Sequence, residues 1–255
     1  MGKTQSLNCF SHHAPKLDWM EQYFTFKNEF KDKNTLGSQM FSFFKRFLKD
    51  ADLLDDNGFT RFAEIISDIG LDENLSWALM LANLAYNPQI GWYICNISFG
   101  ETMSKEYVCS MLVDSGADEK WVNDVWSSLA RILDLPFSHV GLGEMVKEKN
   151  KAVALYRTGW QVPDERVILY SLYQFSEKCG NFKQFTLTRL LDTSIESDGI
   201  SPTQIFGLNR DTMEKVLNGL TFNYPDLIEA RFTLGLDNIT LKSDKSAEEI
   251  LNELF

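Results

Sequence analysis

The chain has 255 residues, 44% of them hydrophobic and 13% aromatic, so it can bury a substantial core and is not a disordered segment. The first sixteen residues lack the apolar core of a signal peptide, and polar residues and a proline interrupt the longest apolar stretch, residues 75–98. We therefore expect a soluble, cytoplasmic protein. The formal net charge of −11 is opposite in sign to that of most nucleic-acid-binding domains.

The charge is unevenly distributed along the chain. Residues 1–50 carry eight Lys and Arg against five Asp and Glu, a net charge of +3, which leaves −14 for residues 51–255. A polyanion such as DNA would therefore contact the N-terminal end. The acidic remainder is better suited to water or to a basic partner protein.

The sequence pattern predicts two helices, at residues 18–30 and 34–49. In the second, Asn34 or Thr35 is the expected N-cap, and apolar residues recur every three or four positions from Leu36 to Leu48. This pattern places Ser38 and Gln39 in the first turn and leaves a basic polar side of Lys45, Arg46 and Lys49. The Asp-Asp-Asn-Gly sequence at 55–58 predicts a hairpin turn, and a third helix is expected from Thr60 to Gly70.

The sequence pattern indicates helices over residues 71–140, with a turn at Asn87-Pro88. Ser115 and Asp118 have the spacing of a capping box before a helix with a wide apolar stripe. A stripe of that kind is more often core than a ligand pocket, and its members are Trp121, Val122, Val125, Trp126, Leu129, Ile132 and Leu133. The charged run 144–151 is interpreted as a linker, or as an exposed helix end. The expected domains are therefore 1–140 and 152–255.

The C-terminal part predicts a more specific order of elements. A helix is expected from Pro163 to Gly180, and Thr186 caps a short helix. A further helix begins at Ser201-Pro202 and breaks at Gly207, and Asn209 caps another that ends at Gly219. Two short strands follow at 227–233 and 238–241. This is the order of a winged helix-turn-helix.

The stretch 34–66 repeats that plan more loosely, with a helix, a hairpin turn and a second helix. The expected fold class is therefore mainly α with small β-hairpins, in which tandem winged-helix-like units flank a helical middle. The DNA-binding candidates are Ser38, Gln39, Lys45, Arg46 and Lys49 in the first unit, and Thr203, Gln204 and Arg210 in the second. Winged helices also dock proteins, and the acids around Arg210 favour that role in the second unit.

We found no constellation of catalytic residues. Gly-rich phosphate loops, nucleophile elbows and paired cysteine motifs are missing from the sequence, so neither an enzyme nor a cofactor is expected. Cys9, His12 and His13 are metal-ligand types within five residues, but structural or surface roles are favoured over a metal site. Glu29-Phe30-Lys31 leaves a metal-dependent nuclease as a remote alternative.

Four segments between residues 8 and 140 resemble a bacterial family of unknown function. They are CFSHHAPKLDWMEQYF, NTLGSQMFSFFKRFLKDADLL, GFTRFAEIISD and SWALMLANLAYN…GWYI. Residues 10–19 correspond to the family's Gly-His-Glu opening, with His12-His13 in place of Gly-His. Residues 36–40 correspond to its Leu-Gly…Lys-Asn-Met-Val helix. Residues 58–63 correspond to its Leu-Thr-Pro-Leu-Gly continuation, without the proline and the glycine.

Genes of this family often neighbour phosphoadenosine-phosphosulfate-reductase-like genes, including loci for DNA phosphorothioation and phage defence. The resemblance therefore implies a non-catalytic, DNA-associated subunit or regulator of such a system. An alternative is an acidic adaptor that recruits a reductase-like or ATP-pyrophosphatase partner from the same locus.

Overall fold

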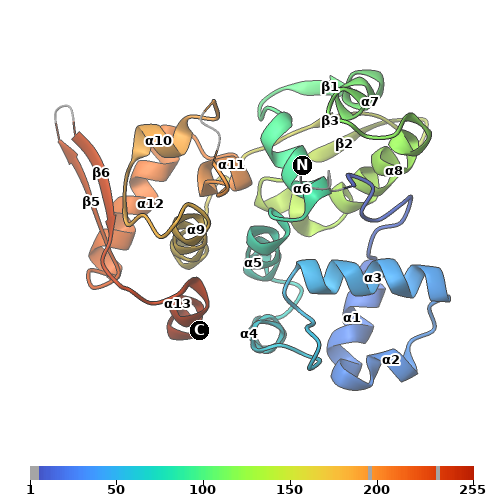
Figure 1. Cartoon of the computed structure of the whole chain (residues 1–255), viewed down its shortest axis with the longest axis horizontal. Coiled ribbons are helices and arrows are strands. Elements are labelled where there is room, and N and C mark those ends of the chain that lie inside the picture. Colours follow the sequence, from blue (N-terminus) through green and yellow to red (C-terminus); the bar gives the residue numbers. More distant parts are fainter. Residues whose placement is uncertain (1–5, 195–196, 234–235) are drawn as a thin grey trace. The chain divides into compact units, whose positions relative to one another are not determined.

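The computed structural model describes residues 6–194, 197–233 and 236–255. The chain divides into two compact units, a first unit of Met1–Thr158 and a second unit of Gly159–Phe255 (Figure 1). Both units are mainly helical, and each contains a three-stranded antiparallel sheet. Among the described residues, no helix combines the length and the apolarity needed to cross a bilayer.

The first unit opens with short helices that agree with the sequence pattern. They are α1 (Leu17–Phe26), η1 (Lys27–Glu29), α2 (Phe30–Lys33), α3 (Ser38–Asp50) and α4 (Arg61–Ile69). Helix α3 begins later than expected, because Asn34 is used elsewhere: its side-chain amide donates to the Phe30 carbonyl (2.9 Å) and its Oδ1 accepts from the Leu36 amide (3.0 Å). Gly37 is the N-cap of α3, with no capping side chain. Thr60 caps α4 as expected, accepting from the Ala63 amide.

An aromatic cluster holds these helices together. The buried ring of Phe44 on α3 lies 5.8 Å from Trp19, 5.6 Å from Phe30 and 6.3 Å from Phe47, measured between ring centroids. Phe47 in turn lies 6.4 Å from Phe137. Edge-to-face and offset contacts at these separations add to the stability that burial provides. The cluster therefore joins elements that lie more than a hundred residues apart in the sequence.

The hairpin expected between α3 and α4 does not form a sheet. Leu54 and Phe59 make one isolated bridge around a turn. The turn is closed by the Asp55 carboxylate, which accepts from the amides of Asn57 (2.7 Å) and Gly58 (2.9 Å). Gly58 has a φ of +117°, which favours glycine. The prediction of a winged-helix-like unit at 34–66 is therefore not confirmed, because one bridge and a side-chain-closed turn stand where a ladder of strand pairs was expected.

The middle of the first unit continues with α5 (Asn74–Leu84), α6 (Pro88–Asn96), α7 (Lys105–Asp114), η2 (Glu119–Trp121), α8 (Val122–Leu133) and η3 (Pro136–Val140). Asn87 caps α6 as the turn signal predicts. The expected capping box at Ser115 does not form, because Ser115 ends α7 and its hydroxyl accepts from the Trp92 indole (2.8 Å). Asp118 caps η2 instead.

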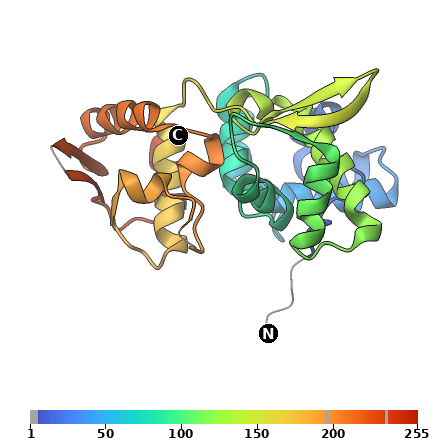
Figure 2. The same cartoon turned by 90° about the horizontal axis from the view of Figure 1, so that it is seen from above.

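The expected linker is a β-hairpin. Strands β2 (Glu144–Glu148) and β3 (Lys151–Tyr156) are antiparallel, and the turn residues Lys149 and Asn150 both have positive φ. The short strand β1 (Thr102–Ser104) pairs with the other edge of β3, which gives the order β1-β3-β2. The hairpin extends outward, with its turn farthest from the helices (Figure 2). The first unit therefore continues to Thr158, beyond the expected boundary at residue 140.

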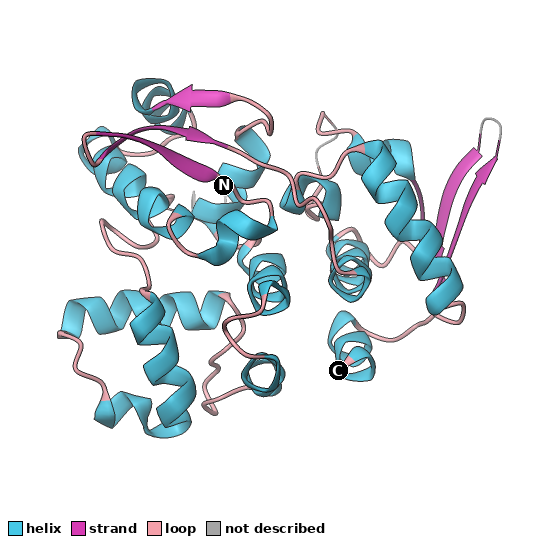
Figure 3. Ribbon diagram, turned by 180° about the vertical axis from the view of Figure 1, so that it is seen from behind, coloured by secondary structure: helices cyan, strands magenta, loops and turns pink. Residues whose placement is uncertain are grey.

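The second unit consists of α9 (Glu165–Lys178), β4 (Gln184–Thr186), α10 (Leu187–Leu191), α11 (Pro202–Phe206), α12 (Arg210–Asn223), β5 (Ile228–Thr233), β6 (Leu236–Leu241) and α13 (Ala247–Leu254). Thr186, Ser201 and Asn209 cap their helices as predicted. Strands β5 and β6 lie side by side at one margin of the unit (Figure 3), and β4 pairs with β6, so the order is β4-β6-β5.

Gly219 does not end α12, contrary to the sequence-based prediction. The helix continues to Asn223, and a Cβ at Gly219 would collide with the Glu165 carboxylate. Gly219 therefore leaves space for the Glu165 carboxylate of α9 and is not a helix stop. The Asn223 side chain donates to the same carboxylate (2.7 Å), which fixes the two helices together.

A buried arginine links the sheet of the first unit to α6. Arg157, directly after β3, is 1% exposed, and its Nη1 donates to the carbonyls of Ile94 (2.6 Å) and Ile97 (2.8 Å). These carbonyls lie at the C-terminal end of α6, where positive charge is favoured. The guanidinium also lies 5.8 Å from the centroid of the Tyr93 ring. The end of β3 is therefore held at the end of α6.

Phe44→Ala should destabilise the first unit by about 3–5 kcal/mol, because it removes a buried ring from a cluster that cannot close around the cavity. The measurement is the free energy of unfolding in urea. Phe222→Ala removes a ring that is 85% exposed and serves as the control. A change below about 1 kcal/mol for Phe44→Ala would show that the aromatic cluster adapts easily.

Arg157→Met should cost about 3–5 kcal/mol, because it leaves two helix-terminal carbonyls without their charged donor in a buried site. Arg157→Lys keeps the charge but loses the paired geometry, and should be intermediate. Urea denaturation followed by circular dichroism measures both. An unchanged or increased stability of the Met variant would mean that the cost of burying the charge exceeds the value of the two hydrogen bonds.

Candidate functional site

The basic face of α3 has the orientation that the sequence predicts. Ser38 and Gln39 are exposed in the first turn, and Lys45, Arg46 and Lys49 are exposed along the side opposite Phe44 and Phe47. The apolar spacing is sufficient to set this arrangement, because the buried rings determine which side of the helix meets solvent.

Two of the three cations on that face are already paired. Arg46 lies 3.4 Å from Asp50 and donates to the buried Cys9 sulfur (3.2 Å). Lys49 lies 2.5 Å from Asp56, and its hydrogen bond lowers the pKa of that carboxyl. Lys45 makes no ion pair with any residue that the structure describes. The face therefore offers a phosphate one uncommitted cation rather than three.

The surroundings of Lys45 are of mixed charge. It lines a cavity of about 340 Å³ together with Lys27 and Lys31. Asp55 and Asp56 line the same cavity. The three lysines come from η1, α2 and α3, so the fold brings them together, but the two carboxylates offset much of their attraction for an anion.

The candidates in the second unit have structural contacts. Thr203 is 2% exposed, and its hydroxyl is hydrogen-bonded to the Ser201 hydroxyl (2.8 Å) and the Leu190 carbonyl, so it does not present a contact to DNA. Gln204 is half-buried, and its backbone amide donates to Ser201. Arg210 donates to Thr188 (3.0 Å) and lies 3.3 Å from Glu214 and 3.7 Å from Asp237. It thus joins α10, α12 and β6.

The hairpin β2–β3 carries cations that the sequence-based analysis left out. Lys147, Lys149 and Lys151 are exposed along it, and Arg131 is exposed in the last turn of α8. Lys147 lies 2.6 Å from Asp134, whereas Lys149 and Lys151 make no ion pair within the described ranges. The charged run 144–151 is the signal in the sequence for these cations, but its charges alone favour a linker rather than a pair of strands.

The start of α8 presents an aromatic side chain. Trp121 is 45% exposed and does not belong to the buried stripe, contrary to the prediction. The Lys120 ammonium lies 5.4 Å from the centroid of its ring. The other six members of the expected stripe are buried, and they are Val122, Val125, Trp126, Leu129, Ile132 and Leu133.

The histidines and Cys9 do not converge on a common point. Cys9 is 1% exposed, and burial raises the pKa of its thiol. The rings of His12 and His13 lie 4.1 Å apart, and that of His13 lies 5.4 Å from Phe43. Burial, together with the neighbouring His12, lowers the pKa of His13. Among residues 6–194, 197–233 and 236–255, no three His, Cys, Asp or Glu side chains are grouped to hold a metal ion.

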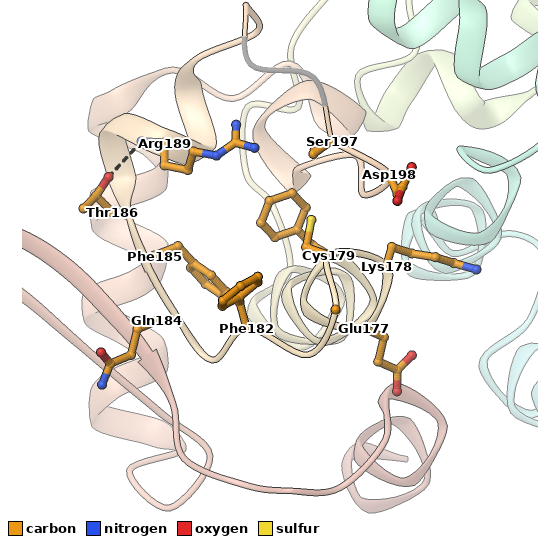
Figure 4. Close-up of a pocket in the computed structure, with 12 residues that line it drawn as sticks. Glu177, Lys178, Cys179, Phe182, Gln184, Phe185, Thr186, Arg189, Ser197 and Asp198 are labelled. Carbon is orange, nitrogen blue, oxygen red and sulfur yellow. Dashed lines mark hydrogen bonds between the residues drawn. The ribbon is translucent and has the colours of Figure 1, made fainter.

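The second unit contains a larger pocket of about 820 Å³ (Figure 4). Its apolar wall consists of Phe175 from α9, Phe182 from the following loop and Phe185 from β4. Arg189 of α10 lies at one side, close to Ser197 in the view of Figure 4. The sequence-based analysis did not identify this pocket, because its residues are spread over four elements.

Comparisons with protein-family models, with curated proteins and with solved structures gave no match to this chain.

Replacing Lys45, Arg46 and Lys49 together by Ala should leave the fold intact, because exposed substitutions each change stability by about 0.5 kcal/mol or less. If this face contacts DNA, the slope of log affinity against log salt should shrink by about one unit, since only Lys45 is uncommitted. Fluorescence anisotropy with a DNA duplex at several salt concentrations measures the slope. A loss of about three units would mean that the two ion pairs break on binding, and an unchanged slope would exclude the face from the DNA contact.

Proposed function

We propose that the chain is a non-catalytic, DNA-associated subunit of a bacterial DNA-modification or phage-defence system, as its family resemblance implies. The observation that carries the proposal is an order of elements that occurs twice. In the first unit, α6 is followed by β1, α7, α8 and the hairpin β2–β3. In the second, α9 is followed by β4, α10, α11, α12 and the hairpin β5–β6.

Strand pairing is also the same in the two units. The short first strand pairs with the last strand of the hairpin, β1 with β3 and β4 with β6, all antiparallel. Helices followed by a hairpin are the order of a winged helix-turn-helix, in which the last helix and the hairpin are the surfaces that meet DNA. This supports two winged-helix-like units, the first of them at 88–156 and not at 34–66.

The charges favour the first unit for DNA contact. Its hairpin carries Lys149 and Lys151 without ion-pair partners in the described part of the chain, and Arg131 is exposed on the adjacent α8. In the second unit the helix before the hairpin, α12, mixes Asp211 and Glu214 with Arg210 and Lys215. Lysines that are free to meet phosphates contribute most of the affinity for nonspecific DNA.

The test is DNA binding by the full chain at about 50 mM salt, measured by mobility shift with and without its locus partner. The variant Lys147→Ala/Lys149→Ala/Lys151→Ala should reduce affinity and shrink the salt slope by about two units, because Lys147 is paired with Asp134. Lys215→Ala/Lys242→Ala/Lys245→Ala makes the same change of charge in the second unit and should behave like the unmodified chain. No binding at this salt concentration, even with the partner present, would exclude direct DNA contact.

A second candidate function is an acidic adaptor that recruits a reductase-like or ATP-pyrophosphatase partner. The second unit holds nine Lys and Arg against 15 Asp and Glu. On its helix α12, Phe222 is 85% exposed. An exposed ring beside acidic residues is more typical of a protein interface than of a DNA contact. Co-purification with the neighbouring gene product supports this function, whereas separate elution at physiological salt contradicts it.

A further inference from the structure

We infer that the pocket between α9, β4 and α10 binds a peptide segment of a partner protein in which an aromatic residue is followed by an acidic one. The pocket shares no residue with the hairpin β2–β3, so this inference does not depend on DNA binding by the first unit. Its occupant is identified by three features of the wall: an exposed apolar surface, a guanidinium that forms no ion pair with the described residues, and a strand edge with a strand neighbour on one side only.

The apolar surface is built from phenylalanines at different depths. Phe175 is buried, and its ring meets that of Phe185 at 5.6 Å and an angle of 78°. Phe182 is 69% exposed beside them. Phe182, Phe185 and Cys179 all line the pocket, as Figure 4 shows. The exposed ring of Phe182 and the half-buried ring of Phe185 leave apolar surface in contact with water, which an aromatic side chain from a partner would cover.

The guanidinium of Arg189 supplies the charge. Its backbone amide is used in the cap, donating to the Thr186 hydroxyl (3.0 Å), so the position of the residue at the start of α10 is fixed. The guanidinium itself makes no hydrogen bond or ion pair with the residues that the structure describes. It reaches toward the pocket in Figure 4. Arginine in such a position can bind a carboxylate with two parallel hydrogen bonds.

The edge strand supplies main-chain groups. In the order β4-β6-β5, β4 has a strand neighbour on one side only, and Gln184, Phe185 and Thr186 all line the pocket. Extended peptides commonly add to such an edge and place alternate side chains in neighbouring pockets. A peptide could therefore use the edge for its backbone, the phenylalanines for its ring and Arg189 for its carboxylate.

The acidic residues of the pocket favour a peptide over a nucleic acid. Glu177 and Asp198 both line it. Glu177 is held at one border, where its carboxylate accepts from the Ala247 amide (2.7 Å). These carboxylates, in a unit whose acids outnumber its bases, would repel a chain of phosphates. A single carboxylate placed on Arg189 avoids that repulsion.

The experiment uses the full ¹⁵N-labelled chain and three short peptides with acetyl and amide ends: Gly-Phe-Asp-Gly, Gly-Phe-Asn-Gly and Gly-Ala-Asp-Gly. The first should shift amide resonances of residues 175–189 with a dissociation constant on the order of 1 mM. The other two should bind roughly tenfold more weakly, because each lacks either the charged hydrogen bonds or the ring.

Two variants and two matched controls locate the binding. Phe182→Ser and Arg189→Gln should each weaken Gly-Phe-Asp-Gly by roughly five- to tenfold. Phe222→Ser and Arg231→Gln remove an exposed ring and an exposed guanidinium elsewhere in the second unit and should have no effect. The spectrum of each variant reports whether it is folded. Because Phe182 is exposed, Phe182→Ser should not unfold the second unit.

Three outcomes would overturn the inference. Equal binding of the Asp and Asn peptides would show that Arg189 does not receive a carboxylate. Stronger binding of adenosine monophosphate than of the peptide would make the pocket a nucleotide site. Shifts that remain absent at about 5 mM peptide would mean that the pocket has no affinity for this class of ligand. The lysine-to-alanine variant of the hairpin β2–β3 should keep peptide binding, which separates this test from that of DNA binding.

Discussion

The position of the hairpin in the first unit depends on one buried cation. Arg157 caps the carbonyl end of α6 directly after β3, and β3 is the strand that pairs with both β1 and β2. A guanidinium that is 1% exposed is costly unless its donors are used, and helix-terminal carbonyls are the acceptors that most need a donor. Gly143 permits the same close approach, because a Cβ there would lie 2.8 Å from the Tyr156 carbonyl oxygen. The sheet, and with it the lysines of the hairpin, is therefore oriented by this contact.

Ion pairing, more than the number of charges, decides which basic surface can meet a polyanion. The turn between α3 and α4 folds back so that Asp56 reaches Lys49, while Asp50 lies one helical turn after Arg46. The turn of the hairpin β2–β3 extends away from the helices (Figure 2), and Lys149 and Lys151 there make no ion pair with the described residues, although Glu148 lies opposite Lys151. A pair of exposed charges contributes little to stability, but it does remove a cation from the set available to phosphate.

The segments from α6 to β3 and from α9 to β6 have similar orders of elements and differ in what they expose. In the second unit, the Arg210 guanidinium at the start of α12 contacts Thr188, Glu214 and Asp237. These contacts within the unit occupy the side chain. Its exposed side chains include two aromatic rings, that of Phe182 in the pocket and that of Phe222 on α12. The proposals therefore assign DNA to the first unit and a protein segment to the second. This division agrees with a chain whose net charge of −11 would weaken DNA binding by the whole surface.

The sequence by itself determined the helices, most of their caps and the buried face of α3. The capping side chains of Thr60, Asn87 and Ser201 bond to backbone amides at most three residues later in the chain. The apolar residues of α3 recur at three or four positions, so both signals are local in the sequence. Tertiary structure decided the rest. Strands β1 and β4 have three residues each, too few for an alternation to be recognised, and they exist because β3 and β6 offer them an edge. The charged strands β2 and β3, the pairing of Lys49 and the burial of Thr203 likewise depend on partners that only the folded chain brings close.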